Sequence, residues 1–150
     1  MLMRLAQLSM LVSFYFTGRA LYHTWGHGFA TEFFGQPIGP HMQFHAVREV
    51  FMALGLIVII ALFMYGPAAF RNRIGWIVMA IASAFLTVGV LIALPITSNT
   101  LPNFEAAMNH YGNTGFAALA LILCWKEYWS AGQPDVASSP GSAAAHTPAG

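Results

Sequence analysis

Four long apolar runs, separated by short polar connections, dominate the pattern of this chain. They cover about 5–25, 44–64, 74–94 and 111–129. Each comes close to the roughly 18 to 20 residues that a helix needs to cross the hydrocarbon core of a bilayer. Backbone groups in lipid have to be hydrogen-bonded within their own segment, so we expect each run to be an α-helix. The pattern predicts an all-α fold, an integral membrane four-helix bundle over 1–129.

The composition agrees with burial in lipid. Of the 150 residues, 57% are hydrophobic and only 7% are charged. A soluble domain of this length exposes too much surface to hide such an apolar fraction, so the lipid bilayer is the expected partner. The net charge is only +1, and we expect no nucleic-acid partner because binding to phosphates requires clustered basic residues. The single cysteine, Cys124, allows neither an internal disulfide nor a multi-cysteine metal site.

The charged connections predict an orientation. Basic residues gather on one side of the predicted bundle, at Arg4, Arg71, Arg73 and Lys126. The connections on the other side, 26–43 and 95–110, contain no Lys or Arg. Because loops rich in Lys and Arg stay in the cytoplasm, we expect both termini to be cytoplasmic, in a bacterial inner (plasma) membrane. Residues 130–150 are small, polar and rich in Pro, Gly and Ser, which predicts a disordered cytoplasmic tail.

This topology brings five histidines to the outer face of the membrane. They stand where the first run ends and where the second and fourth runs begin, at His23, His27, His41, His45 and His110. Scattered histidines would not all fall at one face. The group is therefore a candidate site.

Helical spacing arranges these residues in polar stripes. Residues three or four apart share one face of a helix. That spacing joins Arg19, His23 and His27 on the first helix, His41, His45, Arg48 and Glu49 on the second, and His110, Asn113 and Thr114 on the fourth. A charged side chain inside a span costs roughly 2.5 to 3.5 kcal/mol unless it is paired or hydrated. We therefore expect the stripes to face one another inside the bundle.

Imidazole is the usual protein ligand for divalent metals and for haem iron. We expect His45 and His110 to belong to one site, because both lie on stripes at matching depth. His23 is the expected third member, whereas His27 and His41 lie nearer the loop. All five are candidate metal ligands, and the first three are candidate ligands of a divalent metal or a haem. The alternative is that the histidines form an interfacial belt at the membrane surface.

Two further expectations concern the neighbours of the histidines. Glu49 is expected to form an ion pair with Arg19 or Arg48, because an unpaired charge inside a bundle is costly. Asn113 and Thr114 are expected to surround His110 as hydrogen-bond partners.

Three segments, "FATEFFGQPIGP", "AVREVFMALGLIV" and "NHYGNTGFAAL", resemble a domain-of-unknown-function family of small four-helix membrane proteins related to the DoxX-like group. Members of that family have an FG-P turn after the first helix, an R-[DE] pair that opens the second, and a His-Gly segment that opens the fourth. The matching residues here are Phe34, Gly35, Pro37, Arg48, Glu49, His110 and Gly112. The resemblance covers about 5–125 and implies the four-helix fold rather than an activity. The other histidines depart from the family pattern.

Two classes of function fit these features. The first is a binding or accessory protein whose outward-facing His/Arg/Glu pocket holds a metal ion, a haem or a small lipophilic ligand, as a homo-oligomer or within a larger membrane complex. The second is a membrane-embedded enzyme, an isomerase or a quinone-linked oxidoreductase, that acts on a small apolar substrate. Redox chemistry would need a cofactor, because the chain offers no redox pair of its own. No catalytic residue is assigned, and we expect a binding protein.

Overall fold

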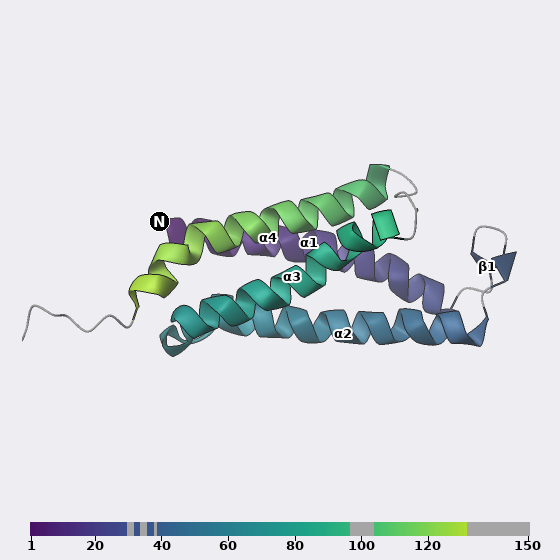
Figure 1. The fold of residues 1–150 in the computed structure, drawn as a ribbon, viewed down its shortest axis with the longest axis horizontal. Coiled ribbons are helices and arrows are strands. Elements are labelled where there is room, and N and C mark those ends of the chain that lie inside the picture. Colours follow the sequence, from purple (N-terminus) through teal and green to yellow (C-terminus); the bar gives the residue numbers. More distant parts are fainter. Residues whose placement is uncertain (30–31, 34–35, 38, 97–103, 132–150) are drawn as a thin grey trace, which may run out of the picture.

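The computed structural model describes residues 1–29, 32–33, 36–37, 39–96 and 104–131. Four long α-helices, each antiparallel to the one before it, cover Leu2–Phe29 (α1), Pro40–Tyr65 (α2), Arg73–Ile96 (α3) and Phe104–Ser130 (α4) (Figure 1). The connections contain a pair of antiparallel two-residue strands, Glu32–Phe33 (β1) and Gln36–Pro37 (β2), and one 3-10 turn at Ala68–Phe70 (η1). The prediction of an all-α fold built from four helices is confirmed.

The helices are longer than the apolar runs, most clearly at the start of α4. This helix begins at Phe104, about two turns before the predicted start at 111. The extra turns contain Ala, Glu and Met, which are strong helix formers. Glu105 stands in the first turn, where the helix dipole stabilises a negative charge. A threshold on apolar residues misses such a segment because it is helical without being hydrophobic.

The four helices form a ring in which each one contacts two others. The most extensive interface joins α1 to α4, and the rest join α1 to α2, α2 to α3, and α3 to α4. The first turns of α1 lie beside the last turns of α4, at the end of the bundle opposite to β1 (Figure 1). The expected turn at Phe34 and Gly35 lies outside the described residues. So does the expected tail, 130–150, except for Ser130, where α4 ends, and Ala131.

The interior of the bundle changes character along its length. One half, which we call the apolar half, contains the first turns of α1 and the last turns of α4; its buried apolar side chains are Met3, Ala6, Met10, Ile60, Met64, Met79, Ala82, Ala120, Cys124 and Tyr128, and Ser9 and Ser83 are buried beside them. The other, the polar half, lies toward β1 and buries Ser13, Thr17, Thr87, Asn109 and Asn113 together with the smaller apolar group of Val50, Ala53 and Ala117. Hydrophobic burial therefore holds the helices together mainly at one end.

Hydrogen bonds between α1 and α4 join these two helices in and beside the polar half. Ser13 Oγ donates to Asn113 Oδ1 at 2.6 Å, and Ser9 Oγ donates to the Phe116 carbonyl at 2.8 Å. Ser9, Ser13 and Thr17 follow one another at every fourth position of α1. Small side chains at that spacing let two helix backbones approach closely, as they do in membrane bundles.

Large apolar side chains cover much of the outside. Phe85 is 74% exposed and Ile122 is 72% exposed. One helix among the described residues, Met42–Tyr65, is long and apolar enough to cross a membrane, and the apolar part of α3, Arg73–Gly89, is shorter. Membrane association is thus supported at one helix, and the arrangement with four spans stays a prediction.

Candidate functional site

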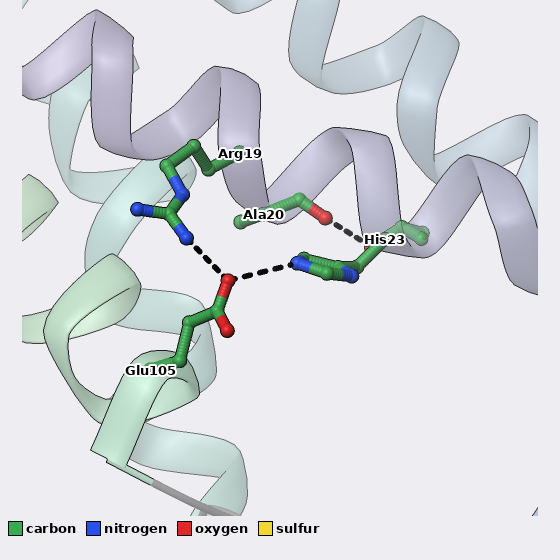
Figure 2. Close-up of polar contacts among 5 residues, drawn as sticks. Arg19, Ala20, His23 and Glu105 are labelled. Atoms are coloured by element: carbon green, nitrogen blue, oxygen red, sulfur yellow. Dashed lines mark hydrogen bonds and ion pairs between the residues drawn. The ribbon is translucent and has the colours of Figure 1, made fainter.

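Arg19 and His23 stand one turn apart on α1 and contact the same carboxylate from α4 (Figure 2). The Arg19 guanidinium donates to Glu105 Oε1, and His23 Nε2 lies 3.3 Å from that oxygen. A spacing of four residues places both α1 side chains on the same face of the helix. We call these three residues the Glu105 cluster. All three are exposed to a similar degree.

The position of Glu105 explains its electrostatics. The hydrogen bond from Arg19, followed by the contact with His23, holds the pKa of the Glu105 carboxyl below its usual value. The positive end of the α4 dipole favours the same ionised form. Because the cluster is exposed, water and salt screen it, so its contribution to stability is small. The cluster joins the first turn of α4 to α1.

A groove of about 530 Å³ lies beside this cluster. It is lined by Phe14, Tyr15, Gly18, Arg19, Tyr22, His23 and Glu105. Arg19 also lies over the ring of Tyr15, with Cζ 6.0 Å from the ring centroid. The Arg19 charge is therefore shared between a carboxylate and an aromatic face.

A second groove, of about 450 Å³, separates α2 from α3. We call it the α2/α3 groove, and it is lined by His45, Arg48, Glu49, Met52, Ala53, Leu56, Phe85, Leu86 and Gly89. The α2 residues recur at intervals of three and four, so they form one face of that helix. The polar residues all belong to the first turns of α2, while the remaining walls are apolar. The groove therefore has a polar end and an apolar body.

His110 is half-buried on α4 and lies within the electrostatic field of Glu49. Burial lowers the pKa of His110, and the negative charge of Glu49 acts in the opposite direction. An imidazole whose pKa is lowered is neutral at neutral pH and accepts a proton. His110 is thus connected to the α2/α3 groove through Glu49, although it does not itself line that groove.

Glu49 does not form the expected ion pair with Arg19 or Arg48. Arg19 pairs with Glu105, and among the described residues neither Arg19 nor Arg48 lies within 4 Å of the Glu49 carboxylate. The reason is the order of the helices in the ring. The Arg19 stripe of α1 faces α4, whereas Glu49 lies on the side of α2 that lines the groove with α3. Arg48 lies over the ring of Phe44 instead, 5.8 Å from its centroid.

Of the two residues expected around His110, Asn113 bonds to α1 and Thr114 bonds to the backbone of His110. Asn113 accepts the hydrogen bond from Ser13 on α1. Thr114 Oγ1 donates to the His110 carbonyl at 2.9 Å and lies 3.5 Å from the Thr87 carbonyl on α3. The contacts with Ser13 and with the Thr87 carbonyl join α4 to its two neighbours, so both residues contribute to helix packing.

The structure divides the predicted histidine site into two groups. His23 belongs to the Glu105 cluster, and His45 belongs to the α2/α3 groove. The side chains of His27 and His41 lie outside the described part of the chain. Within that part, no group of three or more His, Cys, Asp or Glu side chains could hold a metal ion. The metal and haem ligand sets stay predictions.

Glu105 is the site residue that sequence reasoning missed. The hydrophobic pattern leaves it in the 95–110 connection, because the segment around it is not apolar. A signal was present, since "FEAAMNH" consists largely of helix formers and continues directly into the fourth run. Extending that helix by two turns would have placed Glu105 at the same end of the bundle as Arg19.

Known proteins add nothing to this geometry. No protein-family model, curated protein or solved structure matches this chain. The likeness to the DoxX-like group therefore stays a prediction.

Proposed function

We propose that this chain is an integral membrane protein whose four helices all span the bilayer, with both termini in the cytoplasm, and that it binds a small lipophilic molecule. The distribution of polar and apolar side chains supports the proposal that the helices span the bilayer. Ser, Thr and Asn side chains are buried in the polar half of the interior, while large apolar side chains point outward. Only 22% of the most apolar stretch of α2 is buried inside the bundle. A helix in the core of a soluble protein would be mostly buried.

The α2/α3 groove is the observation that carries the binding proposal. Its volume of about 450 Å³ lies within the range of small-molecule sites, roughly 300 to 1,000 Å³. Apolar walls with a few polar groups at one end are the usual construction of such sites. The ligand that fits is a molecule with an apolar ring or chain and a polar head.

The polar end indicates the chemistry of that head. Arg48 donates hydrogen bonds and Glu49 accepts them, and neither is in an ion pair among the described residues. A carbonyl oxygen on the head accepts from Arg48, and a hydroxyl group both accepts from Arg48 and donates to Glu49. The apolar body of the ligand would lie against Met52, Leu56 and Phe85, with its tail toward the surrounding lipid. The protein would then act as a binding or accessory protein.

A membrane-embedded enzyme is the second candidate, and one observation favours it. Glu49 acts electrostatically on His110, a half-buried imidazole with a lowered pKa. Proton transfer on a small apolar substrate needs such a pair of groups, a carboxylate at the polar end of the groove and a neutral imidazole within its electrostatic field. Conversion of such a substrate, abolished by His110→Ala with ligand binding retained, would favour the enzyme over the binding protein.

Two glycines provide a matched test of the groove. Gly89 lines the groove, and a Cβ atom there would meet nothing within 4 Å. Gly55 is equally open but lies on α2 away from the groove. Gly89→Leu adds a side chain to the lining of the groove where its Cβ atom has room, whereas Gly55→Leu adds one outside that lining.

The probe is tritiated decylubiquinone, a quinone with two carbonyl oxygens and an apolar chain, offered to the protein in nanodiscs. We expect binding to fall at least about tenfold in Gly89→Leu, a loss of about 1.4 kcal/mol, and to be unchanged in Gly55→Leu. Thermal unfolding of both variants establishes that they are folded. Equal binding by the two variants would contradict the assignment of the groove.

A further inference from the structure

Three tryptophans form a cluster at the end of the bundle opposite to the grooves. Trp125 and Trp129 on α4 stack with their centroids 3.9 Å apart, and Trp76 on α3 meets both rings edge-on. Trp76 Nε1 also donates to the Leu121 carbonyl at 3.1 Å. Indole rings with a polar N–H are typical of the level where lipid headgroups meet hydrocarbon.

Two arginines lie at this end of the bundle, Arg71 just before α3 and Arg73 as the first residue of α3. Arg73 lies over the ring of Trp129, with Cζ 5.7 Å from the centroid. Arg71 approaches the Glu127 carboxylate at 3.8 Å, which is longer than a hydrogen bond. Arg71 Nε is buried and has no hydrogen-bond partner among the described residues. The positive charge of this pair is therefore only partly neutralised by the protein.

The whole end has an excess of positive charge. It carries Arg4, Arg71, Arg73 and Lys126. Glu127 is the one carboxylate among the described residues at this end. Such an excess beside a tryptophan belt is complementary to an anionic lipid headgroup, whose phosphate accepts several hydrogen bonds from a guanidinium.

We propose that Arg71 and Arg73 bind the phosphate of an anionic phospholipid of the cytoplasmic leaflet, with its acyl chains against the Trp125–Trp129 stack. This inference rests on the proposed four-span arrangement, which places this end at the cytoplasmic surface. The Arg73 guanidinium is already held at the Trp129 ring, so it loses little freedom when it binds a phosphate. The site is separate from the α2/α3 groove and serves to anchor the bundle at a fixed depth.

Quenching of tryptophan fluorescence by brominated lipids tests the proposal. The Trp25→Phe variant is reconstituted into vesicles of brominated phosphatidylglycerol diluted in phosphatidylcholine, and into the reverse mixture. In this variant all fluorescence comes from the cluster, because the chain has four tryptophans. We expect phosphatidylglycerol to be preferred about fivefold, the effect expected from about one basic residue near the surface.

Further substitutions in the Trp25→Phe protein test which residues cause the preference for phosphatidylglycerol. In Arg71→Gln/Arg73→Gln the ratio of quenching by brominated phosphatidylglycerol to quenching by brominated phosphatidylcholine should fall to about one. In Arg71→Lys/Arg73→Lys, which keeps both charges, most of the preference for phosphatidylglycerol should remain. The matched control is Arg19→Gln/Arg48→Gln, which removes two charges from the opposite end and should keep the preference.

The outcomes separate this inference from the proposed function. Equal quenching by both lipids would overturn the lipid site and leave the four-span bundle standing. Quenching by neither lipid would overturn both, since the cluster would then lie outside the bilayer. A preference that survives in Arg71→Gln/Arg73→Gln, or one that the control also loses, would overturn the assignment to these two arginines.

Discussion

The ring of Phe16 occupies the space that a side chain on Gly112 would need. A Cβ atom at Gly112 would lie only 2.9 Å from Phe16 Cε2. The same ring stacks on Phe116, one turn further along α4, with centroids 6.0 Å apart. The α1 and α4 backbones approach closely here because one of them has no side chain at the contact.

Gly112→Ala should therefore destabilise the bundle. Alanine gains about 1 kcal/mol over glycine in a helix interior, but the displaced Phe16 ring costs typically 1 to 3 kcal/mol. We expect a net loss of about 1 kcal/mol in the free energy of unfolding, measured by denaturant titration in detergent. The matched control is Gly115→Ala, where a Cβ atom would meet nothing within 4 Å. It should gain stability, and equal effects of the two changes would contradict the close contact.

The buried serines predict two opposite results. Ser13→Ala leaves Asn113 Oδ1 without its donor at 2.6 Å, which costs about 1 to 3 kcal/mol for a buried acceptor. Ser83 Oγ is also buried but has no partner among the described residues. Ser83→Ala should therefore be neutral or stabilising. Thermal unfolding of the two variants checks both signs, and a Ser83→Ala loss as large as that of Ser13→Ala would show that Ser83 has a hydrogen bond in solution.

The Glu105 cluster predicts a dependence on pH. The bond from Arg19 lowers the pKa of Glu105 in the folded chain, compared with an ordinary value of about 4.3. Its stabilising effect is complete above that ordinary value and is lost as the pH falls through the lower pKa of the folded chain. Glu105→Gln should lower the unfolding midpoint slightly at neutral pH, and the difference from the unchanged protein should disappear in strong acid. A difference that persists at about pH 2 would show that the ion pair is not its cause.

The orientation predicts which side of the membrane reacts with an impermeant maleimide. Phe104→Cys, at an exposed position at the start of α4, should react in intact cells, and Ala68→Cys, at an exposed position in η1, should react only after lysis. Cys124 is buried and gives little background. The reverse labelling pattern would place the Glu105 cluster on the cytoplasmic side.

Much of the fold could be predicted from hydrophobic pattern alone. The long apolar runs determine α2 and α3 closely, because few polar residues interrupt them. The start of α4 could not be predicted in this way, since the first turns around Glu105 are helical by propensity and dipole and are not apolar. The hydrophobic pattern contains no information on helix propensity or on the helix dipole.

The candidate site could be predicted only in part. Spacing correctly places Arg19 and His23 on one face of α1, because a helix fixes that relationship locally. It does not say which helix that face meets. The partner of Arg19 lies 86 positions away in the sequence, and its identity depends on the order of the helices in the ring. The choice between Glu49 and Glu105 therefore required the three-dimensional arrangement.

The unequal halves of the interior also predict where the bundle opens. Close-packed apolar side chains resist separation at the end that holds Met10 and Tyr128, whereas hydrogen bonds such as that of Ser13 to Asn113 can be exchanged for bonds to water. We therefore expect local opening to begin at the polar half, with the apolar half as its hinge. Amide hydrogens near Asn109 should exchange faster than those near Ala120. A ligand would enter by the spreading of the helices at one end, while the opposite end stays closed.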